Sequence, residues 1–349
     1  MKSVLKSLSL SSLLLFTACS SNYVSKGEHM ELTTEWDKTF GKSELVIHKK
    51  VTFKNRYGIT LVGDLYTPKS KQGKLPALAI SGPYGAVKEQ SSGLYAQTMA
   101  ERGFVALAFD PSYTGESGGE PRNVSSPDIN TEDFSAAVDY LGIQENIDRE
   151  KIGIIGICGL GGMSLNAAAV DKRIKAVVTT SMYDMTRVMS KGYYDSMSLA
   201  DRTKALEQLG RERWKDAEAK EYRLSGQGLP DKLTGEEPLF VQQYFDYYKT
   251  PRGFHPRSIN SNSSWTATNS LSFMNMPILS YVKEIAPRPI LIIAGDEAHS
   301  KYFSEDIYKA AAKPKELMIL PKINHTDLYD KTDIIPFDKI TNFFNQNLK

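Results

Sequence analysis

Short apolar runs alternate with longer helical patterns along most of the chain. The runs that predict strands cover residues 75–80, 104–109, 152–157, 174–180, 289–294 and 316–320. The stretches that predict helices cover residues 90–102, 131–141, 164–170, 304–312 and 335–347. Ahead of them, residues 45–54 and 59–68 have the pattern of a β-hairpin. Strands that alternate with helices indicate a mostly parallel sheet with helices on both faces, so we predict an α/β fold.

The alternation is interrupted between about residues 182 and 285. This span carries charged helical stretches, many aromatic residues and a Ser/Asn-rich loop at 258–264. The predicted strands on both sides are needed to complete one sheet, so we interpret the span as an inserted helical cap. We therefore predict one domain over residues 43–349, with a polar tether at 19–42 in front of it.

Composition narrows the class of protein. The chain has 349 residues, of which 41% are hydrophobic and 24% are charged, which is typical of a globular protein with a sizeable core. The formal net charge is only +2, and the basic residues are scattered rather than clustered. Nucleic acid is therefore not an expected partner.

The N-terminus has the pattern of an export signal. Two lysines precede a short apolar stretch at residues 8–16, and Cys19 follows small residues. This resembles a bacterial lipoprotein signal, in which that cysteine is acylated, although Phe16 stands where leucine is usual. The alternatives are an ordinary secretory signal and an apolar start without an export role. We predict a signal peptide at 1–18 and an exported protein held to the membrane by lipid on Cys19.

The only other cysteine, Cys158, directly follows the β-branched run at 152–157. Glycines flank it, and a small-residue helix is predicted at 164–170. A strand that turns sharply into a helix through one reactive side chain has the form of a nucleophile elbow. The helix N-terminus should favour a thiolate there. Leu160 departs from the pattern, which has glycine two residues after the nucleophile, and a buried structural cysteine remains the alternative.

A cysteine nucleophile needs a base and an acid that orients the base, both in loops after later strands. His325 follows the predicted strand at 316–320 and is our candidate base, with His299 as its competitor. Asp296 is the carboxylate nearest the end of the strand at 289–294 and is our candidate acid. The other acids that remain open are Glu297, Asp306 and Asp327.

The oxyanion of an acyl-transfer reaction needs two hydrogen-bond donors. The backbone N–H of Gly159, directly after the nucleophile, is expected to be one of them. The loop after the strand at 75–80 should supply the other, through the N–H or the hydroxyl of Tyr84. A simple tight turn is the alternative interpretation of that loop.

Taken together, these motifs resemble the α/β-hydrolase superfamily, in particular its dienelactone hydrolase branch with a cysteine elbow. More closely, the loops at 110–122, 298–306 and 324–330 are similar to those of bacterial hydrolases related to Xaa-Pro dipeptidyl peptidases and cocaine esterase. The resemblance covers about residues 45–348. It implies an α/β-hydrolase fold, Cys158 as nucleophile and His325 as base, and it brings no substrate with it.

We therefore expect a cofactor-independent, metal-free hydrolase that attacks ester, thioester or lactone carbonyls of a small acyl substrate through an acyl-cysteine. The same site would also suit an acyltransferase. The alternative from another functional class is a binding lipoprotein on an inactive hydrolase scaffold. Leu160 and the unassigned acid are the two features that favour it.

Overall fold

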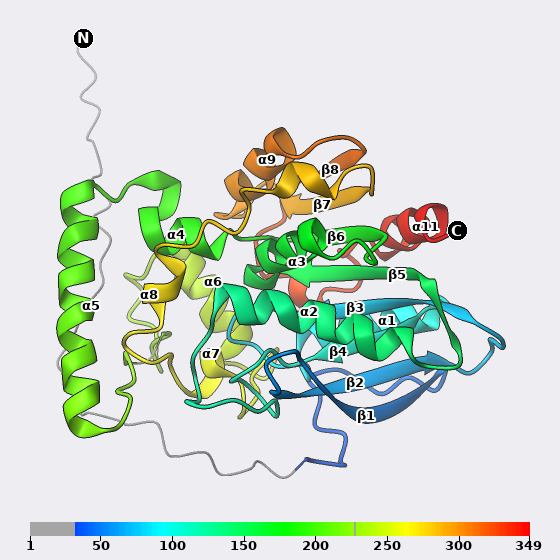
Figure 1. Ribbon diagram of the computed structural model, residues 1–349, viewed down its shortest axis with the longest axis horizontal. Helices are drawn as coiled ribbons and strands as arrows, with labels where there is room; N and C mark the ends of the chain where they lie inside the picture. Colours follow the sequence, from blue (N-terminus) through cyan, green and yellow to red (C-terminus); the bar gives the residue numbers. More distant parts are fainter. Residues whose placement is uncertain (1–31, 227) are drawn as a thin grey trace.

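The computed structural model describes residues 32–226 and 228–349. The predicted signal peptide, Cys19 and the first part of the tether lie outside these described residues. Within them, the sheet has eight strands in the order β1-β2-β4-β3-β5-β6-β7-β8 (Figure 1). The strands are β1 (Val46–Lys54), β2 (Thr60–Pro68), β3 (Leu75–Ser81), β4 (Val105–Phe109), β5 (Ile147–Ile157), β6 (Ala176–Thr180), β7 (Ile290–Gly295) and β8 (Lys315–Leu320).

The sheet is mostly parallel. Only the β1–β2 and β2–β4 pairs are antiparallel, and the pairs from β4 through β8 are parallel. Every residue of β4, β6 and β7 is buried, as expected for strands covered by helices on both faces. The predicted α/β class is therefore confirmed.

Helices cover both faces of this sheet. On one side α1 contacts α11, and on the other α2 contacts α3 (Figure 1). Their bounds, with those of the two helices near the C-terminal strands, are α1 (Ser91–Glu101), α2 (Pro127–Gly142), α3 (Gly159–Val170), α9 (Lys301–Ala310), α10 (Asp327–Asp330) and α11 (Phe337–Asn347).

Helix α2 and strand β5 both begin ahead of their predicted starts. Helix α2 begins at Pro127 because the Ser126 hydroxyl accepts the N–H of Ile129, 3.4 Å away. Thr131, the first residue of the predicted helix, is instead inside it, where its hydroxyl donates to the Pro127 carbonyl. Strand β5 begins at Ile147, ahead of the apolar run, because residue pairing with β3 already starts there.

The chain between β6 and β7 folds as a set of helices. They are α4 (Met185–Lys191), η1 (Tyr193–Asp195), α5 (Leu199–Ala219), α6 (Leu239–Tyr248), α7 (Ile259–Asn262), α8 (Ser270–Phe273) and η2 (Val282–Ile285). The long helix α5 stands at one end of the molecule, away from the sheet (Figure 1). None of the helices in the described part of the chain is long and apolar enough to cross a membrane.

A buried ion network fixes the loop that follows β3. Lys88 in this loop has no exposed surface, and its Nζ lies 2.7 Å from Glu89, 2.9 Å from Asp110 and 2.5 Å from Glu116. Burial disfavours the ammonium, but the surrounding carboxylates outweigh it and hold the pKa of Lys88 well above its usual value. The network ties this loop to the loop after β4.

Candidate active site

Cys158 occupies the sharp turn between β5 and α3. Its φ is +53°, a left-handed value that is rare for a residue with a Cβ atom. Backbone hydrogen bonds hold the turn: the Cys158 N–H donates to Thr180 O (3.0 Å), and its carbonyl accepts from Gly161 and Tyr183 (2.9 Å each). Such over-determined strain is common at functional positions.

The turn requires glycine at several positions, because a side chain there would clash with neighbouring atoms. A Cβ on Gly156 would lie 2.3 Å from Ser164 Oγ, and a Cβ on Gly159 would lie 2.6 Å from the Cβ of Tyr84. Helix α3 approaches the chain after β6 most closely at the following glycines: a Cβ on Gly162 would lie 2.5 Å from Tyr183 O. Leu160 is therefore free to carry a side chain, which is buried beside Gly82.

Two backbone N–H groups face the sulfur of Cys158. They belong to Gly159, at the start of α3, and to Tyr84, in the loop after β3. The Tyr84 hydroxyl is engaged elsewhere, since Asn269 Nδ2 donates to it at 2.8 Å and the ring stacks on Trp265 with centroids 4.2 Å apart. Of the two Tyr84 groups considered from the sequence, the N–H therefore has the geometry of an oxyanion donor.

His325 lies in the loop between β8 and α10 and is fully buried. Its Nδ1 is 2.6 Å from Ser300 Oγ, and its Nε2 is 2.9 Å from the hydroxyl of Tyr329. Burial and, secondly, the nearby His299 hold the pKa of His325 well below its usual value. At neutral pH the imidazole is uncharged and can accept a proton.

The expected acid, Asp296, does not reach this imidazole. Its carboxylate is exposed, and its Oδ1 accepts the backbone N–H of Lys322 at 2.6 Å. Gly295 packs so tightly on the loop after β8 that a Cβ there would lie 1.9 Å from Ile323 O, and the next residue is directed outward. Ser300, which the sequence analysis did not identify, occupies the place next to Nδ1.

The other candidate acids also have partners away from His325. Asp327 accepts the N–H of Asn324 at 3.0 Å and pairs with Lys331 at 2.5 Å. Asp306 pairs with Arg187 at 2.9 Å, and Glu297 is exposed. No sequence motif marks a serine whose hydroxyl will hydrogen-bond Nδ1 of a histidine, so only the folded chain reveals the role of Ser300.

We expect Ser300→Ala to lower kcat by about tenfold or more, because it leaves a buried imidazole N–H without a partner. Asp296→Asn, a matched substitution on the exposed turn, should change kcat by less than about threefold. Steady-state kinetics of the two variants on one substrate show whether Ser300 or Asp296 orients His325. A large loss in Asp296→Asn with an unaffected Ser300→Ala would restore the carboxylate as orienting group.

Tyrosine side chains surround the sulfur, although no motif in the sequence points to them. The hydroxyls of Tyr329 and of Tyr244 in α6 lie close enough to Cys158 to lower the pKa of its thiol. Burial is the dominant effect on the thiol and raises the pKa of Cys158, although these hydroxyls and the two N–H groups act in the opposite direction. The expectation of a resting thiolate at the helix N-terminus is therefore wrong: burial outweighs the dipole, and the neutral thiol is the resting form.

His299 lies in the same aromatic shell but is not the partner of the sulfur. Its Nε2 hydrogen-bonds the hydroxyls of Tyr183 and, at 3.4 Å, Tyr244, while its ring centroid is 5.0 Å from that of His325. Burial lowers the pKa of His299 to about 4. A second neutral imidazole thus lines the site. Among the described residues, no group of three or more His, Cys, Asp or Glu side chains could hold a metal ion.

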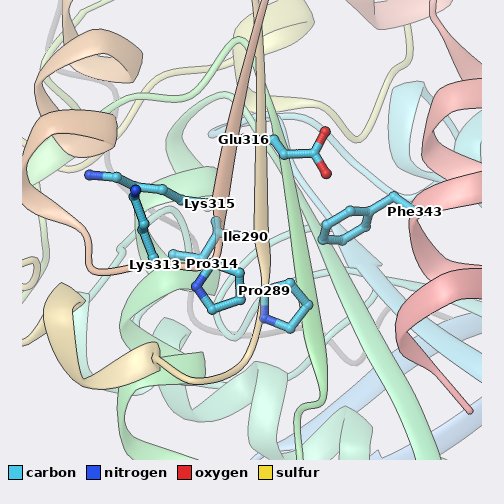
Figure 2. A pocket seen from close by; sticks show the side chains of 7 residues that line it. All are labelled: Pro289, Ile290, Lys313, Pro314, Lys315, Glu316 and Phe343. Carbon is cyan, nitrogen blue, oxygen red and sulfur yellow. The ribbon is translucent and has the colours of Figure 1, made fainter.

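A pocket of about 300 Å³ lies at the other edge of the sheet. It is lined by Pro289, Ile290, Lys313, Pro314, Lys315, Glu316 and Phe343 (Figure 2). Ile290 and Lys315 are the first residues of β7 and β8, whereas Cys158 follows the last residue of β5. The pocket is thus remote from the reactive groups. The side chains that could carry out a reaction lie around Cys158.

With the fold and the geometry around Cys158 described, the chain can be compared with known families. The X-Pro dipeptidyl-peptidase (S15 family) model matches residues 57–274. The chain belongs to this family. The fold is that of the α/β hydrolases, and the S15 family membership supports a hydrolase. The predicted resemblance to the α/β-hydrolase superfamily and to Xaa-Pro dipeptidyl peptidases is confirmed.

Relatives of this S15 family chain include proteins of bacteria and fungi. "Uncharacterized protein PA2218" of Pseudomonas aeruginosa is 64% identical over 336 residues, which are 94% of this chain and 88% of that protein. Its crystal structure has a TM-score of 0.89 and 65% identity, over 92% of this chain and 100% of that one. "Thiohydrolase aneE" of Aspergillus aculeatus is 28% identical over 298 residues, 80% of this chain and 87% of that protein.

A more distant structure bears on the fold alone. The alpha/beta hydrolase GrgF from Penicillium sp. sh18 has a TM-score of 0.71 at 22% identity, over 86% of this chain and 99% of that one. A related sequence, "Polyketide transferase grgF", is 27% identical over 292 residues, 79% of this chain and 89% of that protein. The shared architecture therefore extends over the S15 match and beyond it.

Proposed function

We propose that the chain hydrolyses ester or thioester carbonyls through an acyl-cysteine on Cys158. The single observation that carries this is the position of the sulfur: it sits on a strained turn with φ +53°, and the N–H groups of Gly159 and Tyr84 are directed at it. A purely structural cysteine needs neither the strain nor two converging donors.

The reaction balances with the groups at hand. Sγ attacks the carbonyl carbon as His325 takes up the thiol proton, and the developing oxyanion accepts hydrogen bonds from Gly159 and Tyr84. When the tetrahedral intermediate collapses, the bond to the leaving alcohol or thiol breaks, and that group takes the proton from His325. Water then attacks the acyl-cysteine, the acid departs, and the sulfur regains its proton.

An acyltransferase is the second candidate, and one observation favours it. Cys158 is only 6% exposed, so bulk water does not reach the sulfur freely in this conformation. An alcohol or thiol acceptor bound in the site would then compete with water for the acyl-cysteine. Relatives named as a thiohydrolase and a polyketide transferase are consistent with either outcome.

Mass spectrometry of the protein after mixing with an activated ester or an acyl thioester tests the proposal. We expect one added acyl group, located on the peptide that contains Cys158, which decays as free acid or, with an added alcohol, as a new ester. The relative yields decide between hydrolysis and transfer. No adduct across acyl chains of varied length would support the rival interpretation, a binding protein on an inactive scaffold.

We also propose that the protein is exported and anchored through lipid on Cys19, as the N-terminal pattern indicates. Cys19→Ala should leave an unprocessed precursor, because the modified cysteine is the processing point in such signals. Detergent phase partitioning of cells that express either form measures this. If both forms enter the aqueous phase at the same size, the lipid anchor does not exist.

A further inference from the structure

Tyr329 lies at the junction between the nucleophile and the base. It is in the short helix α10, four residues after His325, and it is fully buried. Its hydroxyl is 2.9 Å from His325 Nε2. The same hydroxyl lies close enough to the sulfur of Cys158 to affect the pKa of the thiol. One oxygen atom therefore hydrogen-bonds the base and also lies near the thiol from which the proton must move.

The surrounding chain holds this hydroxyl in place. The ring of Tyr329 packs edge-on against Tyr247, with centroids 5.0 Å apart. The backbone of the preceding residue is fixed because Tyr95 donates its hydroxyl to Leu328 O at 2.7 Å. A buried side chain with such neighbours has little freedom to swing aside, so the contact between oxygen and imidazole is a stable feature of the site.

The direction of the hydrogen bonds around His325 depends on which ring nitrogen carries the proton. A neutral imidazole carries a single proton, and the tautomer protonated at Nδ1 donates to Ser300 Oγ, 2.6 Å away. Nε2 is then the free acceptor and takes the O–H of Tyr329. The lone pairs of the Tyr329 oxygen remain available for the S–H of Cys158.

We propose that Tyr329 is a catalytic residue that passes the thiol proton of Cys158 to Nε2 of His325. This rests on the proposed acyl-cysteine mechanism. As the sulfur attacks, its proton moves to the Tyr329 oxygen while the O–H proton moves to Nε2. The products are the sulfur–carbon bond and an imidazolium, and the tyrosine ends neutral as it began. When the tetrahedral intermediate collapses, the leaving group takes the proton from the imidazolium of His325.

The electrostatics of the site agree with a relay of this kind. Burial, together with the nearby Cys158, raises the pKa of Tyr329 well above its usual value. A stable tyrosinate is therefore not formed, and the two protons move together rather than one after the other. Tyr244, which also lies near the sulfur, has no hydrogen bond to His325 among the described contacts and offers no equivalent route.

The decisive variant is Tyr329→Phe, which removes one oxygen and keeps the ring. We expect the rate of acylation of Cys158, followed in single-turnover experiments, to fall by about 10²–10⁴-fold with little change in KM, the range usual for positioned proton transfer. Tyr247→Phe is the matched control, because that ring packs on Tyr329 without contacting the reactive groups. It should stay within about threefold of the wild type.

A proton inventory in mixtures of H₂O and D₂O provides a readout that a structural role would not move. The wild-type acylation rate should depend on the deuterium fraction along a curve, because two protons are in flight. The residual rate of Tyr329→Phe should follow a straight line. A straight line for the wild type overturns the relay even if Tyr329→Phe fails to fold, which thermal unfolding will detect.

The outcomes separate the relay from the mechanism on which it rests. If Cys158→Ala is inactive while Tyr329→Phe acylates within threefold of Tyr247→Phe, the relay is wrong and the acyl-cysteine stands. If Cys158→Ala retains full turnover, the proposed function itself fails, and the relay fails with it.

Discussion

Cys158→Ala is expected to lower turnover by at least about 10⁴-fold, since loss of a covalent nucleophile costs about 10⁶-fold in a well-studied serine hydrolase and binding groups preserve some rate. Cys158→Ser should retain weak activity, because the N–H groups of Gly159 and Tyr84 remain but a hydroxyl is harder to ionise. Turnover of a single activated thioester by the purified variants measures both effects.

His325 should behave as part of the same unit. His325→Ala is expected to cost about as much as Cys158→Ala, and the double variant should be scarcely worse than either, because groups that share one proton transfer are not additive. Additive losses would indicate two independent roles.

The pH profile gives an independent check on this pair. The pKa of His325 is held well below 6.5, and that of Cys158 is raised. Protonation of the base therefore sets in only at acidic pH, below the range of an ordinary histidine. The wild-type kcat/KM should stay level between pH 7 and about 6, whereas a halving near 6.5 would show an unperturbed base.

Lys88→Met should lower the free energy of unfolding by about 3–5 kcal/mol, which is usual when one partner is removed from a buried ion pair. The change leaves Glu89, Asp110 and Glu116 around an apolar side chain, and all three contact Lys88 Nζ within 2.9 Å. Urea unfolding of the variant, at constant m-value, measures the loss.

Lys74→Met is the control, because Lys74 is exposed and should matter by less than about 0.5 kcal/mol. An equally small change in Lys88→Met would mean that water or rearrangement compensates the buried carboxylates. Since the same loop carries Tyr84, a reduced acylation rate in folded Lys88→Met would also link the ion network to the oxyanion donor.

The sequence by itself was sufficient for the fold class. The hydrophobic periodicity and the length of an apolar run distinguish a buried strand from a helix. The apolar run that ends at Ile157 therefore predicts β5 without tertiary information. The position of Cys158 between that run and a glycine-rich helix start is equally local. The place of His325 after the final strand follows from strand order alone.

The ends of the elements depended on how the folded backbone orients side chains that are near one another in sequence. Helix α2 starts at Pro127 because Ser126 happens to be oriented as a cap, and Thr131, an equally good cap in composition, lies inside the helix. Both residues suit a helix start, and only the folded backbone selects one.

The tertiary structure decided the electrostatics of the site. Asp296 was the candidate acid because it is the carboxylate nearest the end of β7. Tight packing at Gly295 directs that carboxylate to the surface, and Ser300 contacts His325 instead. Helix position suggested a thiolate, yet burial raises the pKa of Cys158. Local sequence determines which groups exist and on which strand they end, while burial and close packing, which sum over the whole chain, determine their partners and their charge.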